Sequence, residues 1–363
     1  MKRKWSLRLG AAVLCAVLLG SCGGTAAAPA ESTAPADPLT GQQLLYPEQR
    51  AAAVVIENTT GSTTQWGIGS ASVVLEAAAR ADTAPSLCLV YPSVSAMPTV
   101  GPVTLGQDLF WRLLSGQQVL PIQRGCDLYT RNFLDYWNLR AVDALETGRN
   151  AFTTGNTDWA SPLWCTNGQS VAKVLGSLSL SSALSEDPAG SADSTQEGDT
   201  PAVPTVPALL PQQTDGHLPD ADVADAVQAA VQFPSGSTTR FAYDTDTGTY
   251  GMLHHDGSPQ LDANTGIQAA FDNLLVLYSA STPRDDGRTL DYDLTMGGGL
   301  WLNGGHLWHI TWTQGTGSTF AFYDADGRPL RILSGRSYIA WLSSLTGEEV
   351  TVQDSAGNDL LQS

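Results

Sequence analysis

One stretch near the middle of the chain constrains the fold most, because it cannot contribute much to a hydrophobic core. Residues 183–230 are acidic and rich in proline, with few large apolar side chains. This composition favours an extended linker or mobile insertion. We therefore expect two folded parts, an N-terminal domain at residues 49–182 and a C-terminal domain at residues 231–345, followed by a C-terminal tail at residues 346–363.

The N-terminus has the pattern of an export signal. Four basic residues, Lys2, Arg3, Lys4 and Arg8, precede an apolar run, Leu9 to Leu19, which is shorter than the roughly 20 residues of a membrane-spanning helix. The next residues, Leu19-Gly20-Ser21-Cys22, resemble the bacterial lipobox, in which the cysteine thiol receives the lipid. The alternative is an ordinary secretory signal with a different cleavage site.

This pattern predicts a lipoprotein signal peptide at residues 1–21 and lipidation of Cys22, with palmitate among the attached acyl chains. We expect residues 22–48, rich in Ala, Pro, Ser and Thr near their start, to form a disordered tether. The protein would then be anchored to the cell membrane by its lipid and face the extracytoplasmic side.

The charge of the chain excludes several partners. It has 36 acidic and 18 basic residues, and four of the basic ones lie in the signal segment. Nucleic acids and anionic lipid surfaces both require positive patches, so we expect neither nucleic acid nor a charged bilayer to bind this body directly. No cofactor-binding motif occurs, because the glycine-rich stretches lack the lysine of a phosphate-binding loop.

Hydrophobic patterns predict an α+β fold, with a mixed α/β N-terminal domain and a β-rich, mainly antiparallel C-terminal domain. In the N-terminal domain, residues 51–56 are typical of a buried strand. Residues 72–79 and 86–91 form a candidate hairpin, although the first run could equally be helical. Helices are expected at 105–114 and 128–137 and after Asn167, a candidate N-cap. In the C-terminal domain, tight-turn signals at 245–248, 303–305 and 324–327 predict successive hairpins.

Three cysteines remain after the signal and the lipid site. Cys88 lies in an apolar run and is expected to be a buried thiol. Cys126 and Cys165 have more polar surroundings and are a candidate disulfide, which an extracytoplasmic location would permit. Sequence alone does not decide between this pairing and free thiols.

Catalytic and metal-binding patterns are weak. The five histidines form none of the spacings of a zinc site, so we expect no metal. Acidic residues near the tight turns are ordinary turn residues. Arg124-Gly125-Cys126 has a faint similarity to the active-site motif of L,D-transpeptidases, but no histidine precedes it.

Aromatic residues in loops suggest a binding surface. Trp66, Trp159 and Trp164 lie in polar, loop-like stretches, where they either pack as struts or contact a ligand. Together with Gly101 and Pro102, Trp66 and Trp164 are the candidate binding residues of a groove in the N-terminal domain.

Segments in both domains resemble the YerB-like lipoprotein family, which is built from two adjoining domains of unknown function. The N-terminal similarity rests on residues 50–58, 65–77 and 100–103, and the C-terminal similarity rests on residues 241–250, Asp262, 272–278 and 319–327. The resemblance implies an α+β lipoprotein and supplies no catalytic mechanism. The chain departs from the family pattern around Thr104, Gln123 and Leu163, where relatives carry arginine or histidine motifs.

These observations favour a non-enzymatic envelope lipoprotein that binds or scaffolds an envelope protein or a glycan. The alternative is an envelope enzyme acting on peptidoglycan, with Cys126 or scattered carboxylates as the reacting groups.

Overall fold

The computed structural model describes residues 35–59, 64–155, 162–185, 205–216, 218–315, 317, 319–345 and 347–361. The described part belongs to one compact unit, Pro35–Ser363. Within it, strands predominate and a few short helices accompany them, so the predicted α+β class is confirmed. Among the described residues, no helix is both long and apolar enough to cross a membrane.

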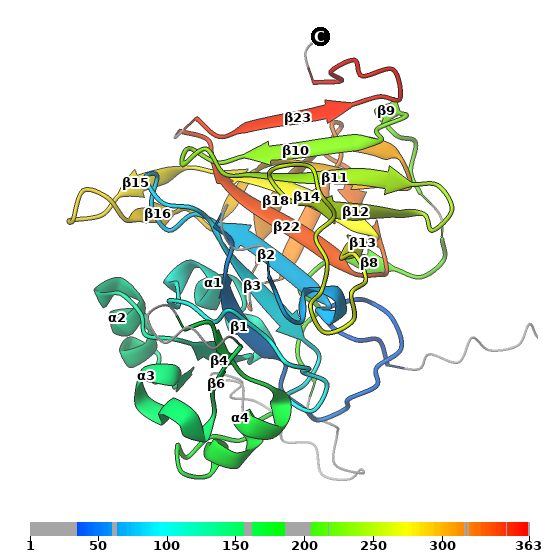
Figure 1. Cartoon of the computed structure of the whole chain (residues 1–363). Coiled ribbons are helices and arrows are strands. Elements are labelled where there is room, and N and C mark those ends of the chain that lie inside the picture. The colour runs from blue at the N-terminus through cyan, green and yellow to red at the C-terminus, as the bar shows by residue number, and fades with distance from the viewer. Residues whose placement is uncertain are drawn as a thin grey trace, which may run out of the picture. The chain divides into compact units, whose positions relative to one another are not determined.

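A twelve-stranded sheet forms the centre of this unit (Figure 1). Its strands, in spatial order, are β20 (Pro329–Leu330), β19 (Phe320–Tyr323), β18 (His306–Gln314), β17 (Met296–Asn303), β14 (Asn273–Ser279), β22 (Ser337–Ser343), β2 (Val73–Ala77), β3 (Ser86–Tyr91), β1 (Ala52–Glu57), β4 (Leu120–Gln123) and β5 (Val142–Asp143), with β9 (Val223–Ala224) paired to β18. The predicted hairpin within residues 72–91 is confirmed, because β2 and β3 are antiparallel neighbours.

The central sheet is continuous across the two predicted domains. β22 comes from the C-terminal region and lies between β14 and β2, parallel to both. Val73 of β2 is in register with Ser337, and Ala77 is in register with Trp341. The proline-rich segment therefore does not separate two independent sheets, and its later part contributes β9 to the central sheet.

A five-stranded sheet packs on one face of the central sheet and forms the upper layer of Figure 1. Its strands are β13 (Ala270–Phe271), β12 (Thr249–Leu253), β11 (Thr238–Asp244), β10 (Gln228–Gln232) and β23 (Glu349–Gln353). β23 lies in the stretch that the sequence assigns to a tail, and it pairs with β10 over five residues. Alternating Val and Thr residues in this stretch are consistent with the strand.

Helices and short strand pairs complete the fold. The helices are α1 (Asp108–Leu113), α2 (Leu128–Tyr136), α3 (Ala144–Thr147) and α4 (Gly168–Leu175), with single 3₁₀ turns at Ile68–Ser70, Ser115–Gln117 and Gly148–Asn150. The strand pairs are β15 (Ser281–Pro283) with β16 (Leu290–Tyr292), β8 (Gln212–Gln213) with β21 (Ile332–Leu333), and β6 (Thr153–Thr154) with β7 (Trp164–Cys165). The three predicted helices correspond to α1, α2 and α4.

The core lies on both faces of the central sheet. Along β22, Tyr338, Ala340 and Leu342 face the five-stranded sheet, whereas Ile339 and Trp341 face the opposite cluster. Strands buried on both faces are expected to be apolar throughout. β2 follows this rule except for its one charged residue, Glu76.

The N-terminal end of the described chain is more ordered than the sequence suggests. Leu39 is buried in the second core cluster, and the Asp37 carboxylate accepts hydrogen bonds from the backbone amides of Leu39 and Thr40 at 2.9 and 3.0 Å. Part of the stretch predicted as a tether therefore packs against the body.

Candidate functional site

Glu76 is a carboxyl group in the middle of the central sheet, and its residue is 0% exposed. Its position in β2 directs its side chain to the face that the five-stranded sheet covers. Asn58 Nδ2 donates to Glu76 Oε1 at 2.6 Å, and Thr239 Oγ1 donates to the same oxygen at 2.9 Å. The hydroxyl of Tyr338 donates to Oε2. Four segments from both regions of the chain therefore meet at one carboxyl group.

Burial raises the pKa of Glu76 from 4.5 to about 7, because the charged form loses its hydration. The hydrogen bonds from Tyr338, Thr239 and Asn58 favour the charged form and oppose this effect only in part. Carboxyl groups with such shifts concentrate at functional sites, and Glu76 lies beside a cleft.

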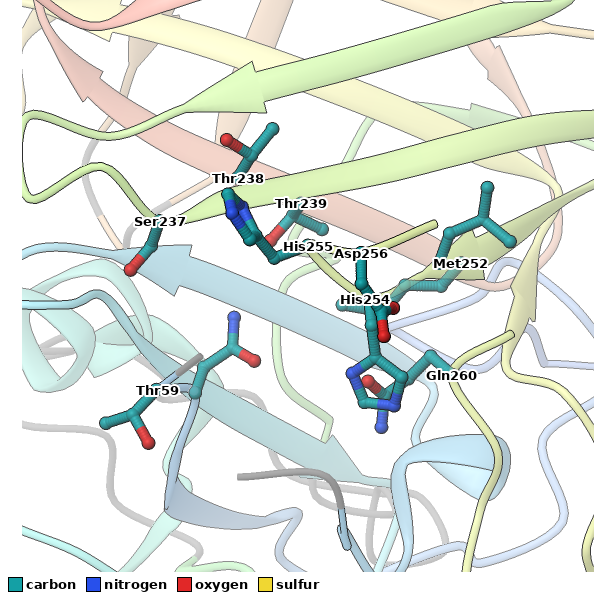
Figure 2. A pocket seen from close by; sticks show the side chains of 11 residues that line it. Thr59, Ser237, Thr238, Thr239, Met252, His254, His255, Asp256 and Gln260 are labelled. Carbon is teal, nitrogen blue, oxygen red and sulfur yellow. The ribbon is translucent and has the colours of Figure 1, made fainter. Parts of the chain in front are cut away.

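The cleft is a cavity of about 90 Å³, which we call the interdomain cleft. Two residues that hold Glu76, Asn58 and Thr239, are among its lining residues, so the buried carboxyl lies directly behind the wall. The full lining is Asn58, Thr59, Ser237, Thr238, Thr239, Met252, Leu253, His254, His255, Asp256 and Gln260. Figure 2 shows His254 and Gln260 on one side of the cleft, with Ser237 and Thr59 on the other.

Local chain geometry explains how these residues gather. β11 begins at Thr238 and Thr239, and Ser237 directly precedes it. β12 ends at Leu253, and the turn after it holds His254, His255 and Asp256. This turn is closed by hydrogen bonds from the amides of Ser258 and Gly257. Asn58 directly follows β1, so the N-terminal region contributes the opposite wall.

The interdomain cleft has no fixed positive charge, because none of its lining residues is lysine or arginine. Burial lowers the pKa of His254, so this imidazole is neutral at pH 7, while hydrogen bonds from Ser258 lower the pKa of Asp256 and keep it ionised. The electrostatic environment of the cleft is therefore neutral to negative.

Two buried polar atoms near Glu76 have no hydrogen-bond partner among the described residues. Gln260 lines the cleft, is 1% exposed, and has an unpaired Nε2. Gln65 donates through Nε2 to Glu57 O and Asn58 Oδ1, at 2.6 and 3.2 Å, but its Oε1 is unpaired. Unpaired buried polar groups are rare in proteins, and each one requires a physical explanation.

The candidate binding residues predicted from the sequence do lie together, but outside this cleft. Trp66 N donates to Gly101 O at 2.8 Å, and Val103, next to Pro102, donates through its backbone N to Trp164 O at 2.7 Å. Both tryptophans are half-buried. A Cβ atom at Gly101 would lie 2.7 Å from the Cys165 sulfur, so glycine is required here for close packing. Their role in binding stays a prediction.

The three described cysteines are free thiols, so the predicted pairing of Cys126 with Cys165 is not formed in this structure. The backbone of Cys126 pairs with that of Gly106 in an isolated β-bridge beside β4. Cys165 belongs to β7 and packs against Gly101 and Gly155. Burial raises the pKa of the Cys126 thiol and raises that of Cys165 to about 11. Cys88 is a buried thiol, as predicted.

Other predicted features fall partly outside the described residues. Cys22 with its signal segment, and Trp159, are not among them. Within the described residues, no group of three or more His, Cys, Asp or Glu side chains is arranged to hold a metal ion.

Sequence reasoning missed Glu76 and the interdomain cleft. A signal existed, because Glu76 is the single charged residue in the apolar run Val73–Ala77. The residues that complete the site are distant in sequence, however: Thr239 lies 163 positions and Tyr338 lies 262 positions from Glu76. No local pattern connects them.

Comparisons with known proteins agree with this architecture. Residues 39–180 match the N-terminal domain, and residues 229–339 match the C-terminal domain, of the family described as protein of unknown function DUF3048. Asn58 and Thr59 come from the first match and the rest of the cleft lining from the second. A search of curated proteins found no match.

The crystal structure of the YerB protein from Bacillus subtilis has a similar fold, with a TM-score of 0.70 at 20% sequence identity. The similarity covers 87% of this chain and 99% of the YerB chain. The order of the two matched domains and the shared fold lead to one conclusion: the chain belongs to the YerB-like family, defined by the N- and C-terminal domains of DUF3048.

Proposed function

We propose that this protein is a lipid-anchored binding protein of the cell envelope that takes a small polar ligand in the interdomain cleft and does not transform it. The observation that carries this proposal is the cleft itself, which both family domains line and which the Glu76 network supports from behind. Ligand sites occur preferentially at domain interfaces, with a few polar groups in fixed positions.

The hydrogen bonds around Glu76 make the cleft walls rigid. Asn58 and Thr239 each donate to Glu76, so their side chains are held before any ligand arrives. Groups held in this way lose little conformational entropy on binding, which favours affinity. The arrangement supports a binding role for these walls.

The reacting groups that an enzyme would need are poorly placed. Glu76 is 0% exposed and lies behind Asn58 and Thr239, so it does not reach a molecule in the cleft. Burial raises the pKa of Cys126, which lowers the fraction of nucleophilic thiolate. These two observations favour binding over the alternative of an enzyme acting on peptidoglycan.

Binding can be tested with the Pro35–Ser363 unit, which contains both core clusters and has three methionines, Met97, Met252 and Met296. Met252 lines the cleft, whereas Met97 lies in the core and Met296 is exposed elsewhere. With ¹³C-methyl-methionine labelling, soluble envelope fragments released by muramidase digestion should shift the Met252 signal and leave the other two unchanged. If turnover of these fragments is detected instead, the binding proposal is wrong.

The anchoring part of the proposal rests on the lipobox at Leu19–Cys22. In a bacterial host, radiolabelled palmitate should enter the full-length protein, and Cys22→Ser should abolish the labelling. The wild-type protein should sediment with membranes and be accessible to added protease in cells whose wall has been removed. Unlabelled protein in the cytoplasmic fraction would contradict this part.

A further inference from the structure

We infer that a proton on Glu76 controls the interdomain cleft: the cleft stays closed, as in this structure, while Glu76 is protonated, and ionisation of Glu76 opens the wall formed by Asn58 to water. The inference concerns regulation of the cleft and rests on the proposed binding function for its role. The opening itself requires no ligand and is measured without one.

The surroundings of Glu76 suit a neutral acid better than a carboxylate. The residue is 0% exposed, and the partners described for its carboxyl group are the amide of Asn58 and the hydroxyl groups of Thr239 and Tyr338. None of these groups carries a positive charge, and the neighbours in register on β3 and β22 are leucine and alanine. An ionised carboxylate here loses its hydration and gains no counter-ion, so the closed form favours the proton.

The other titratable groups around this position keep one charge state where Glu76 changes its own. Burial raises the pKa of Tyr338 on β22 well above its ordinary value, and across the cleft burial lowers the pKa of His254 from 6.5 while Asp256 stays ionised. Glu57 and Arg240 point away, because they alternate along β1 and β11 with residues that face the space between the two sheets. Above pH 6.5, the group in this set that changes its charge is therefore the carboxyl group behind the wall.

The network around Glu76 is fixed on one side and less constrained on the other. The Tyr338 ring packs between Phe241 and Phe271, with centroid distances of 4.6 and 5.9 Å. Asn58, by contrast, is half-buried, follows the end of β1 and lines the cleft. The cleft volume of about 90 Å³ holds several water molecules. When Asn58 moves aside, this water reaches the carboxylate and replaces the hydration that burial removed.

The titration of Glu76 gives the direction of the switch. In the closed form its pKa is about 7, whereas a hydrated carboxyl group has the ordinary value of 4.5. The ratio of open to closed molecules should therefore rise up to roughly 300-fold as the pH increases from below 4.5 to above 7. An open wall is no longer held in place before a ligand arrives, so ligand affinity should fall as the pH rises.

The three methionine methyl groups report the opening directly. Met252 lines the cleft and is 2% exposed, Met97 is 4% exposed in the core, and Met296 is 63% exposed. We would measure how strongly a neutral, soluble gadolinium chelate relaxes these ¹³C-methyl signals in the Pro35–Ser363 unit at pH 5.5, 7 and 8.5. The effect on Met252 should grow about threefold or more over this range, while those on Met97 and Met296 stay constant. An equal increase at Met97 would indicate general loosening and overturn the inference.

Variants assign the pH dependence to one group. Glu76→Gln resembles the neutral acid, so Met252 should stay protected at every pH. Tyr338→Phe removes a hydrogen bond that favours the charged form of Glu76, so the midpoint of the Met252 profile should move to higher pH. Glu349→Gln, at an exposed position of β23, should leave the profile unchanged. A profile that persists in Glu76→Gln would assign the effect to His254 and refute the inference; if that variant does not fold, the midpoint of Tyr338→Phe decides.

The outcomes also separate this inference from the proposed function. If envelope fragments shift the Met252 signal while its relaxation in the free protein does not change with pH, the switch is wrong and the binding function stands. If the relaxation changes with pH as expected and no fragment binds at pH 5.5, the opening is supported and the binding function fails.

Discussion

At the scale of single residues, Glu76 shows that a carboxyl group can accept several hydrogen bonds and still have a strongly raised pKa. Three donors contact its two oxygens, yet desolvation dominates its titration. A carboxyl group held in this way takes up a proton on folding, because the unfolded chain releases that proton at a lower pH. Protonation of Glu76 should therefore make the stability of the protein depend on pH.

The first prediction concerns Glu76→Gln. The folded pKa of about 7 lies above the ordinary value of 4.5, so the contribution of Glu76 to stability is fully present below pH 4.5 and is lost as the pH rises to 7. The wild-type protein should lose about 3 kcal/mol relative to Glu76→Gln across this window. Urea unfolding of both proteins at pH 4.5, 6 and 8 measures the difference.

Glu349→Gln, at an exposed position of β23, is the control for this prediction. Its unfolding free energy should follow that of the wild-type protein at all three pH values. Parallel curves for the wild-type protein and Glu76→Gln would show that burial does not govern the titration of Glu76.

A second prediction concerns Arg336, whose guanidinium group joins the two domains. Its nitrogens donate to the carbonyl oxygens of Ala71, Ala270 and Ile68 at 2.9, 2.7 and 2.9 Å, and it lies over the ring of Phe271. Lysine keeps the charge but cannot reproduce three donors in one plane. Arg336→Lys should therefore lower the free energy of unfolding by about 2 kcal/mol or more.

Arg328→Lys is the matched control, because Arg328 lies on an exposed turn and pairs only with acidic neighbours. It should leave the unfolding free energy nearly unchanged, because ion pairs in solvent contribute little to stability. Equal effects of the two substitutions in chemical denaturation would contradict the role assigned to Arg336.

Predictions about single residues are confirmed where neighbouring residues in the sequence determine the environment. Asn167 caps α4, because its Oδ1 accepts from Ser170 N at 2.8 Å, and Cys88 is buried within its apolar strand. The interdomain cleft was not predictable in this way, since Asn58, Thr239 and Gln260 come from three separated segments. Their proximity depends on tertiary structure alone.

At the scale of elements, α4 begins in close contact with the loop after β3. A Cβ atom on Gly168 would lie 2.0 Å from Val94 O, so the first position of this helix tolerates no side chain. At the other end, a Cβ atom on Gly176 would meet nothing within 4 Å, and this residue has helical backbone angles (φ −61°, ψ −40°). An added methyl group is therefore excluded at Gly168 and has room at Gly176.

The third prediction uses this pair. Gly168→Ala should lower the free energy of unfolding by about 2 kcal/mol or more, because the clash is with backbone that cannot rotate away. Gly176→Ala should raise it by about 0.5 to 1 kcal/mol through the reduced entropy of the unfolded chain. Thermal or urea unfolding of both variants checks the signs, and a destabilised Gly176→Ala protein would refute the second half.

Elements defined by short-range patterns were predictable, and those defined by pairing partners were not. The hairpins β11–β12 and β17–β18 follow from turn residues between apolar runs. The parallel pairing of β14 with β22 was not predictable, because parallel pairing leaves no turn signal. β23 was missed for a similar reason, since its partner β10 lies far away in the sequence.

At the scale of the whole molecule, the two family domains share a single sheet. β22 supplies the neighbour of β2, so the N-terminal region lacks a complete sheet without the C-terminal region. The salt bridge between Arg284 and the buried Asp108, at 2.6 Å, is a second connection between the regions. The regions matched at residues 39–180 and 229–339 therefore lie in one compact unit, and the predicted division into two domains stays a prediction.

The fourth prediction is that the regions do not fold alone. A fragment of residues 35–185 should show no cooperative unfolding transition, because the edge of β2 is unpaired and the Glu76 face is uncovered. Mixing it with a fragment of residues 205–361 should restore a cooperative transition, measured by circular dichroism during urea unfolding. A cooperative transition in the shorter fragment alone would show that the shared sheet is dispensable.

The position of β22 sets a minimum waiting time during translation. Tyr338 is synthesised 262 residues after Glu76, its hydrogen-bond partner. At the usual elongation rates, roughly 13 to 50 s pass between the two. Throughout that interval the apolar residues of β2 lack their β22 neighbour, so slower ribosomes or premature stop codons should increase aggregation of this protein.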